Sequence, residues 1–223
     1  MAQKRENVTI HSQEKLAEGI YSMWLDAPEV AAEAKPGQFI AVYTNDQSKL
    51  LPRPISICEA DKENGRLRIV YRIAGAGTLE FSQYHAGDKL DIMGPLGNGF
   101  TLQNKKAFLI GGGIGIPPML ELAKPLDCEK TAVLGYRAAE TFLADEIGQF
   151  ADVVIASDDG SVGTKGNVID AIKANGLKAD IIYACGPTPM LMGLKKYAAE
   201  NGIECYISLE EKILSSKEHI VTK

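Results

Sequence analysis

The sequence predicts a two-domain protein in which an antiparallel β-barrel precedes a doubly wound parallel α/β sheet. The chain has 223 residues, enough for two domains of about 100 residues each. Its first half contains short runs of β-branched and aromatic residues separated by turn residues, whereas its second half alternates such runs with helical patterns. We therefore place a β domain at residues 1–103 and an α/β domain at residues 104–223.

Six strands are predicted in the first domain, with turn sequences such as KPGQ, KENG and HAGDK between them. The predicted strands span residues 7–12, 19–26, 38–44, 54–60, 67–74 and 89–94. One short helix over residues 77–85 interrupts them. Six strands at this spacing are typical of a small closed barrel.

Five buried strands and four helices alternate in the second domain. The strands are predicted at residues 106–112, 130–137, 152–158, 180–186 and 204–208, and the helices at 116–124, 138–150, 167–175 and 188–202. Alternation of strand and helix is typical of a parallel, doubly wound sheet.

Composition excludes several classes of protein. The net charge is −5 and no basic stripe is visible, which argues against a nucleic-acid partner. The N-terminus lacks the apolar stretch of a signal peptide, and no apolar run approaches the roughly 18 residues of a membrane span. We expect a cytoplasmic protein. The four cysteines are widely spaced, so no local zinc or iron–sulfur motif is encoded and no metal site is expected.

Four glycines lie in the segment GGGIGIPPM, which joins the first predicted parallel strand to the next helix. They are Gly111, Gly112, Gly113 and Gly115. Glycines permit a tight turn and let a phosphate approach the backbone at a helix N-terminus. The pattern G-x-G-x-x-P departs from the usual dinucleotide fingerprint, so a plain strand-to-helix turn is the alternative.

Two further segments should meet this loop, because ligands of open parallel sheets bind beyond the carboxyl ends of the strands. One is YACGPTPM, in which Cys185, Gly186 and Pro187 follow a strand. The alternative for Cys185 is a small buried core residue, the commoner fate of such a cysteine.

The other segment, ASDDGSVGTKG, supplies Asp158 and Asp159 at the end of the third strand, and its alternative is a solvated turn. These carboxylates would repel the 2′-phosphate of NADP, so we expect NAD, with Asp158 among its contacts. Arg137, after the second strand, is a contrary sign, since it could bind a phosphate.

The barrel contains two candidate anion sites. The run LLPRPISI places Arg53 and Ser56 in an apolar strand, where a guanidinium needs an anion, although an edge arginine beside a proline is common. The run IVYRIAGAGTLEF places Arg72 on a strand before Gly77 and Thr78, which open a helix. A further glycine cluster, GPLGNGF, closes the barrel. Two phosphate-type sites in different domains imply two nucleotides.

These motifs, in this order, resemble those of the ferredoxin–NADP reductase superfamily. The segments RPIS, VYRIAGAGT, GPLGNGF, GGGIGIPPM, SDDGSVGTKGNV and YACGPTPM are most similar to those of the electron-transfer subunits of NAD-dependent (type B) dihydroorotate dehydrogenases. The resemblance extends from about residue 5 to about residue 211.

The resemblance implies FAD on the barrel and NAD on the parallel sheet. It assigns FAD contacts to Arg53, Pro54, Ile55, Ser56, Val70, Tyr71, Arg72, Gly77 and Thr78. It assigns NAD contacts to Gly111, Gly112, Gly113, Gly115, Cys185, Gly186 and Pro187. Ser56 and Cys185 would flank the reacting rings and are the candidate catalytic residues.

One departure from the family lies near the C-terminus. Family members continue after SLEE into a cysteine-rich tail that ligates a [2Fe–2S] cluster, whereas this sequence reads SLEEKILSSKEHIVTK. Ser215 and Ser216 stand about where the first ligand cysteine is expected, and hydroxyls are poor ligands for such a cluster. We expect this chain to lack the cluster.

The resemblance implies a flavoprotein that carries electrons between NAD(H) and a catalytic dihydroorotate dehydrogenase subunit in pyrimidine biosynthesis. Two alternatives remain open. The chain could be a stand-alone NADH-dependent flavin or dye reductase, or a flavin-binding scaffold that stabilises a partner.

Overall fold

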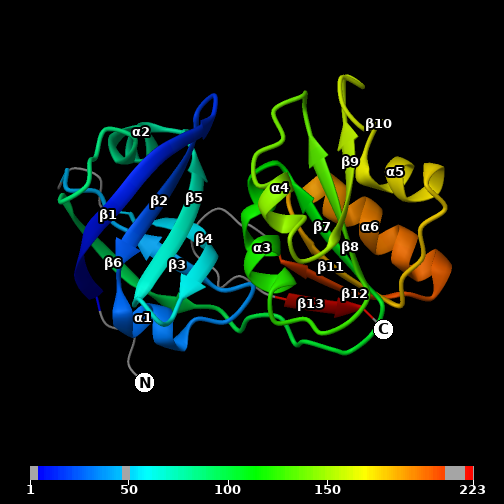
Figure 1. The fold of residues 1–223 in the computed structure, drawn as a ribbon, viewed down its shortest axis with the longest axis horizontal. Helices are drawn as coiled ribbons and strands as arrows, with labels where there is room; N and C mark the ends of the chain where they lie inside the picture. Colours follow the sequence, from blue (N-terminus) through cyan, green and yellow to red (C-terminus); the bar gives the residue numbers. More distant parts are fainter. Residues whose placement is uncertain (1–4, 47–50, 209–218, 223) are drawn as a thin grey trace. The chain divides into compact units, whose positions relative to one another are not determined.

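The computed structural model describes residues 5–46, 51–208 and 219–222, and the chain forms two compact units, Met1–Gly97 and Asn98–Lys223 (Figure 1). The division falls before the predicted boundary at residue 103. The physical reason is that the connecting segment bonds to the second unit: the Tyr183 hydroxyl donates to the Thr101 carbonyl at 3.0 Å and accepts from the Gln103 amide at 3.0 Å.

The first unit contains the predicted closed antiparallel barrel. Its strands are β1 (Arg5–Ala17), β2 (Ile20–Asp26), β3 (Phe39–Val42), β4 (Arg53–Asp61), β5 (Arg66–Arg72) and β6 (Lys89–Leu96). Their order around the barrel is β1-β2-β5-β4-β3-β6, and β6 pairs with β1 to close it. All six predicted strands are confirmed.

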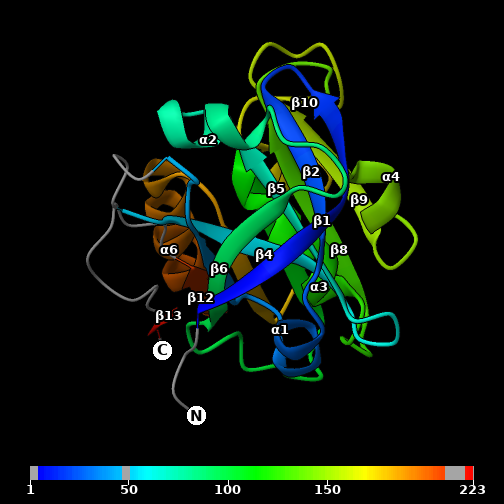
Figure 2. The same cartoon turned by 90° about the vertical axis from the view of Figure 1, so that its left-hand side faces the viewer.

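Two short helices lie at opposite ends of this barrel, α1 (Pro28–Glu33) and α2 (Ala76–Phe81) (Figures 1 and 2). Helix α2 is shorter than the predicted helix over residues 77–85, and α1 was not predicted. A proline in its first turn and the alanines that follow suit α1 to a single helical turn after β2.

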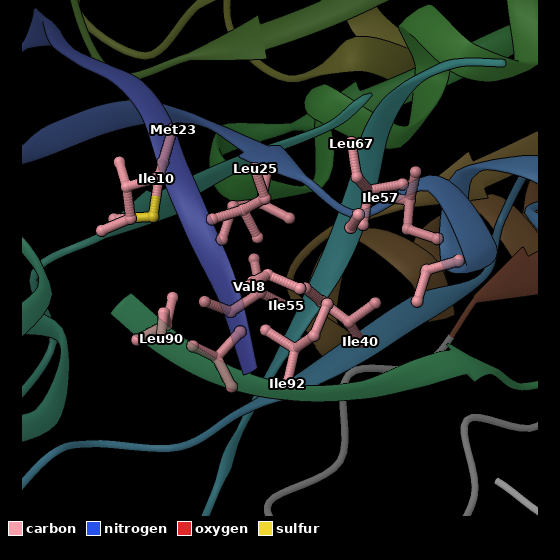
Figure 3. Close-up of a cluster of buried hydrophobic side chains, with 14 of the residues drawn as sticks. Val8, Ile10, Met23, Leu25, Ile40, Ile55, Ile57, Leu67, Leu90 and Ile92 are labelled. Atoms are coloured by element: carbon pink, nitrogen blue, oxygen red, sulfur yellow. The ribbon is translucent and has the colours of Figure 1, made fainter. Parts of the chain in front are cut away.

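Alternating residues of all six strands fill the barrel, as the period of two in a strand requires. Figure 3 shows this core, whose labelled members are Val8, Ile10, Met23, Leu25, Ile40, Ile55, Ile57, Leu67, Leu90 and Ile92. Tyr71 and Phe81 also belong to it, so β5 and α2 are both anchored in the interior.

The second unit is built on a seven-stranded sheet in the order β10-β9-β8-β7-β11-β12-β13. The strands are β7 (Ala107–Gly112), β8 (Lys130–Tyr136), β9 (Asp152–Ser157), β10 (Thr164–Lys165), β11 (Ile181–Cys185), β12 (Glu204–Ser208) and β13 (His219–Thr222). All neighbouring pairs are parallel except the antiparallel pair of β12 and β13. The five predicted strands are confirmed, and β10 and β13 extend the sheet at its edges.

Helices cover both faces of this sheet, as a doubly wound fold requires. They are η1 (Gly113–Gly115), α3 (Pro117–Ala123), α4 (Ala144–Ile147), α5 (Val168–Ala174) and α6 (Thr188–Asn201). Figure 1 shows α3 and α4 on one face and α5 and α6 on the other. The prediction of a helix over residues 138–150 was wrong in length, because Leu143 has φ of 65° and the helix begins only after it. Within the described residues, every helix is too short or too polar to cross a membrane.

Candidate functional site

The two candidate anion motifs of the barrel form one cluster. Strand β4 begins at Arg53 and its antiparallel neighbour β5 ends at Arg72, so both arginines lie at the same end of the barrel. Helix α2 follows β5 and brings Gly77 against Arg53: a Cβ at residue 77 would lie 2.5 Å from Arg53 Nε and 2.8 Å from its Cζ. A side chain at residue 77 would therefore push the Arg53 guanidinium out of this position.

The cationic end of the barrel has capacity for an anion. Arg53 Nη1 donates to the carbonyl of Leu51, and within the described parts of the chain no carboxylate forms an ion pair with Arg53 or Arg72. Two exposed apolar residues are near in the chain, Leu51 two residues before Arg53 and Leu79 two residues after Gly77. A guanidinium with spare donors suits an anionic ligand such as a phosphate.

The Thr78 hydroxyl organises the loop that opens α2. It accepts hydrogen bonds from the amides of Ala74 at 2.8 Å and Gly75 at 3.3 Å. A Cβ at Gly75 would meet no atom within 4 Å, so this loop is open on one side. The predicted contact residue Thr78 thus fixes the backbone of a loop that a ligand can approach.

Tyr71 has its side chain inside the barrel. Its hydroxyl donates to Gln13 Oε1 at 2.7 Å, and its ring stacks on Tyr21 at 5.9 Å and meets Phe81 edge-on at 6.0 Å. Burial raises the pKa of the phenol far above its usual value. The hydroxyl of this predicted FAD contact is therefore occupied within the protein.

The remaining predicted FAD contacts divide between the two faces of their strands. Ile55 packs into the barrel core, so its neighbour Ser56 projects to the opposite face, where it is also buried. Val70 is buried on the face opposite to Tyr71, and Pro54 is exposed. Pro54, Ile55 and Ser56 belong to β4, which begins at Arg53, and Val70 belongs to β5, which ends at Arg72.

The glycine loop of the second unit packs against its own chain. A Cβ at Gly115 would overlap the carbonyl of Cys185, and one at Gly112 would lie 2.5 Å from Met190 Sδ. A Cβ at Gly111 would lie 2.8 Å from the Cα of Ile116. Most of these glycines are therefore required by close packing within the protein, in agreement with the alternative of a tight turn.

Gly113 differs from the other three glycines. It is exposed, its φ is +52°, and a Cβ there would meet nothing within 4 Å. The loop thus leaves one backbone position open, in a conformation that favours glycine. This position is the one that a phosphate could approach.

The three predicted NAD segments meet at the carboxyl edge of the sheet. In register, Cys185 pairs with Gly111, Gly112 with Gly135, and Tyr136 with Ser157. Cys185 is buried, with 1% of its surface exposed, and Gly186 and Pro187 follow it. A Cβ at Gly186 would lie 3.2 Å from the backbone nitrogen of Gly112. The two catalytic candidates belong to different units, Ser56 to the first and Cys185 to the second.

The charged residues near the end of β9 differ in their hydrogen bonding within the protein. Asp158 is exposed directly after β9, whereas Asp159 accepts hydrogen bonds from the amide and hydroxyl of Ser161 at 2.9 and 2.7 Å, which lower its pKa. Arg137 is exposed after β8. Tyr136 is buried and donates to the Phe142 carbonyl at 2.9 Å, so it does not compete for a ligand.

Sequence reasoning missed two polar residues beside the barrel cluster, Gln13 and Glu80. Gln13 Nε2 donates to the carbonyls of Phe81 and Tyr84, and Glu80 accepts from the backbone beyond β3. Apart from Tyr84, four residues after Glu80, these partners lie 34 to 71 residues away in the chain, so no local pattern could have revealed them.

Comparison with known proteins agrees with this architecture. Residues 7–100 match the family model of the oxidoreductase FAD-binding domain. Over 218 residues the chain is 44% identical to the dihydroorotate dehydrogenase B (NAD(+)) electron transfer subunit of Streptococcus mutans, covering 94% of this chain and 83% of that protein. The corresponding subunit of Geobacillus kaustophilus is 41% identical over 218 residues, covering 94% and 84%.

Solved structures show the same fold. The NADH-dependent reduced ferredoxin–NADP oxidoreductase superposes with a TM-score of 0.86 at 31% identity, over 96% of this chain and 79% of that one. A ferredoxin–NADP+ reductase from Neisseria gonorrhoeae with bound FAD and NADP gives a TM-score of 0.74 at 16% identity, over 96% of each chain. Because the curated relatives exceed 40% identity over most of both lengths, the chain belongs to the family of dihydroorotate dehydrogenase B (NAD(+)) electron transfer subunits.

Proposed function

We propose that this chain binds FAD on its barrel unit and NAD(H) on its sheet unit, and carries electrons between NAD(H) and a catalytic dihydroorotate dehydrogenase subunit. The observation that supports this most directly is the cluster of Arg53 and Gly77, a cation without a carboxylate partner in the described residues, beside an open loop. The names of the relatives supply the partner and the reaction.

The residues of the barrel unit have distinct roles in this proposal. Arg53 and Arg72 neutralise the phosphates of FAD, because guanidinium groups form charge-assisted hydrogen bonds with phosphate oxygens. Ser56 lies near the flavin. Tyr71 supports β5 from inside the barrel through its bond to Gln13. Bound FAD supplies the hydride and electron chemistry, which side chains cannot provide.

On the sheet unit, the carboxyl edge receives NAD. Gly113 lets the pyrophosphate approach the backbone, Gly111, Gly112 and Gly115 hold the loop against residues 185–190, and Cys185 lies beside the nicotinamide. Asp158 disfavours a 2′-phosphate, so NADH is the expected reductant in preference to NADPH.

We also propose that residues 1–223 hold no iron–sulfur cluster. Cys58 lies on β4, Cys185 on β11 and Cys205 on β12, whereas a cluster needs four thiolates held close together. In the described residues there is no group of three or more His, Cys, Asp or Glu side chains that could hold a metal. Ser215 and Ser216 lie outside the described residues.

Co-expression with a catalytic dihydroorotate dehydrogenase subunit tests the proposed function. We expect the two chains to copurify, FAD to accompany this chain, and NAD+ to be reduced when dihydroorotate is added. A matched preparation without the catalytic subunit should retain FAD and lose the dihydroorotate reaction. Flavin-loaded protein that never associates with the catalytic subunit, yet turns over with NADH and dyes, would instead favour the stand-alone reductase.

A further inference from the structure

We propose that Gln13 and Glu80 are positioning residues for the flavin nucleotide: they fix helix α2 from two sides so that Gly77 stays against Arg53. This inference rests on the proposed binding of FAD by the barrel unit. It concerns two residues that do not belong to the motifs of the resemblance, and that act through hydrogen bonds to the elements which carry those motifs.

Helix α2 needs external support. It has six residues, of which only Gly77 and Phe81 are buried. An isolated helix of this length does not persist in water, because its few hydrogen bonds do not offset the cost of nucleation. Its position therefore depends on its contacts with the barrel.

Gln13 holds the C-terminal side of α2. Its Nε2 donates to the carbonyl of Phe81, the last residue of α2, at 3.1 Å and to the carbonyl of Tyr84, in the turn that follows, at 2.8 Å. Its Oε1 accepts from the hydroxyl of Tyr71 at 2.7 Å. One amide thus joins β1, β5 and α2.

Glu80 holds α2 to the chain beyond β3. Its Oε1 accepts hydrogen bonds from the Tyr84 hydroxyl at 2.5 Å and from the amides of Asn45 at 2.8 Å and Asp46 at 3.3 Å. Two of these are backbone N–H groups bound to a carboxylate, which is the stronger class of hydrogen bond. Glu80 thus ties α2 to the chain that follows β3.

The consequence for the cofactor site follows from the close fit at Gly77. The Arg53 guanidinium packs directly against Gly77, so the position of α2 is one of the contacts that limit its direction. A helix that shifts would leave Arg53 free to adopt other rotamers, and ordering it again would cost binding free energy. Loss of Glu80 or Gln13 should therefore weaken FAD binding more than it weakens the fold.

The test compares Glu80→Ala, Glu80→Gln and Gln13→Leu with a matched control, Glu63→Ala. Glu63 is an exposed carboxylate in the turn between β4 and β5, at the other end of the barrel from α2. The Kd of FAD is measured by flavin fluorescence on apoprotein, and the Tm of each apoprotein is measured in parallel. The KM for NADH is measured at saturating FAD.

We expect Glu80→Ala and Gln13→Leu each to raise the Kd of FAD roughly tenfold, as loss of one or two charge-assisted or helix-end bonds implies. Glu80→Gln keeps a side-chain acceptor and should recover most of that loss. The control should match wild type, and the NADH KM should stay unchanged in all variants. A variant that combines Glu80→Ala with Gln13→Leu should lose less FAD-binding free energy than the sum of the two single losses, because both residues act through one helix.

Two results would overturn the inference while leaving the proposed function intact. One is wild-type FAD affinity in Glu80→Ala and Gln13→Leu. The other is a loss of affinity that follows the fall in apoprotein Tm, with no recovery in Glu80→Gln. Absence of FAD binding by the wild-type chain would remove the proposed function, and the inference with it.

Discussion

Arg53 places a guanidinium at one end of the barrel, against Gly77. The Leu51 carbonyl accepts a hydrogen bond from one N–H of the Arg53 guanidinium, which leaves its other donors for a ligand. Gly77 has the complementary role, since any other residue would displace the arginine. Arg53 and Gly77 belong to separate motifs in the chain, so no local pattern indicated this contact.

Replacement of Arg53 by alanine should weaken FAD binding selectively. Loss of one charge-assisted phosphate contact costs about 1.5–3 kcal/mol, which corresponds to a rise in Kd of roughly 10- to 150-fold. Fluorescence titration of apoprotein with FAD measures it. Arg66→Ala is the control, since Arg66 lies at the opposite end of β5 and pairs with Asp26 at 3.4 Å. Equal affinity of both variants would contradict the assignment of Arg53 to FAD.

Gly115 tests the packing of the nucleotide loop. In Gly115→Ala, the new Cβ would overlap the backbone of Cys185 and Gly186, which cannot move as a flexible side chain would. We expect a lower Tm and weaker NADH binding, with the Tm loss corresponding to about 1–3 kcal/mol of overpacking. Gly193→Ala in α6 is the control, where the nearest atom is 3.4 Å away and alanine favours the helix. Wild-type behaviour of Gly115→Ala would show that the loop and residues 185–190 are not closely packed.

At the scale of elements, the segment after the barrel is held to β11 and β12 by a polar cluster. Gln103 Nε2 donates to Glu204 Oε1 and to the Tyr206 hydroxyl, both at 2.8 Å, and Lys105 Nζ donates to Glu204 Oε2 at 2.7 Å. Tyr183 and Tyr206 stack at 5.5 Å beside it. These bonds attach the connecting chain to the sheet unit, which is why the division falls at Gly97.

This cluster should make the stability of the sheet unit depend on pH in the acid range. Hydrogen bonds from Lys105, Gln103 and Tyr206 lower the pKa of Glu204 from 4.5 to about 2. Because the pKa is lower in the folded state, the stabilisation is complete above about pH 4.5 and is lost as the pH falls toward 2.

Glu204→Gln keeps the side-chain shape and removes the titration. We expect the Tm of wild type to exceed that of the variant at pH 6, and the difference to shrink between pH 4.5 and 2. Each 1 kcal/mol lost lowers the Tm by roughly 2–4 °C in a chain of this size. Thermal unfolding of both proteins across this pH range measures it, and a difference that stays constant to pH 2 would contradict the role of the carboxylate.

At the scale of the whole molecule, each compact unit carries one set of predicted cofactor contacts. The barrel carries the residues predicted to contact FAD, and the sheet carries those predicted to contact NAD. Hydride transfer between the two cofactors needs both units but no acid–base side chain, and the three histidines are not among the predicted contacts.

The isolated chain should therefore reduce soluble dyes with NADH while it carries no iron–sulfur cluster. Iron and sulfide assays on freshly prepared protein, beside steady-state dye reduction with NADH and NADPH, check each part. We expect sub-stoichiometric iron, turnover with NADH and a lower kcat/KM with NADPH. Stoichiometric iron would contradict the first part, and a preference for NADPH would show that Asp158 does not govern the choice of nicotinamide.

Much of the architecture was predictable, because hydrophobic period and turn residues are local properties. Short runs of β-branched and aromatic residues in the first half, and strand–helix alternation in the second, correctly predicted all eleven main strands. Helix lengths were less predictable: α2 ends at Phe81 and α4 begins only after Leu143, since both are fixed by contacts and backbone conformation that propensity does not encode. The edge strands β10 and β13 are short and depend on a neighbour for their pairing.

The sequence by itself determined the two-domain fold, the family and the segments for which cofactor contacts are predicted, since motifs and periodicity are read from neighbouring residues. Only the tertiary structure decided which contacts the residues in those segments make within the chain. It put Gly77 against Arg53, Gly115 against Cys185 and the Tyr71 hydroxyl inside the barrel. It also revealed Gln13 and Glu80, whose partners lie far along the chain. Such contacts depend on how distant segments pack, and packing is a property of the folded chain rather than of any window of its sequence.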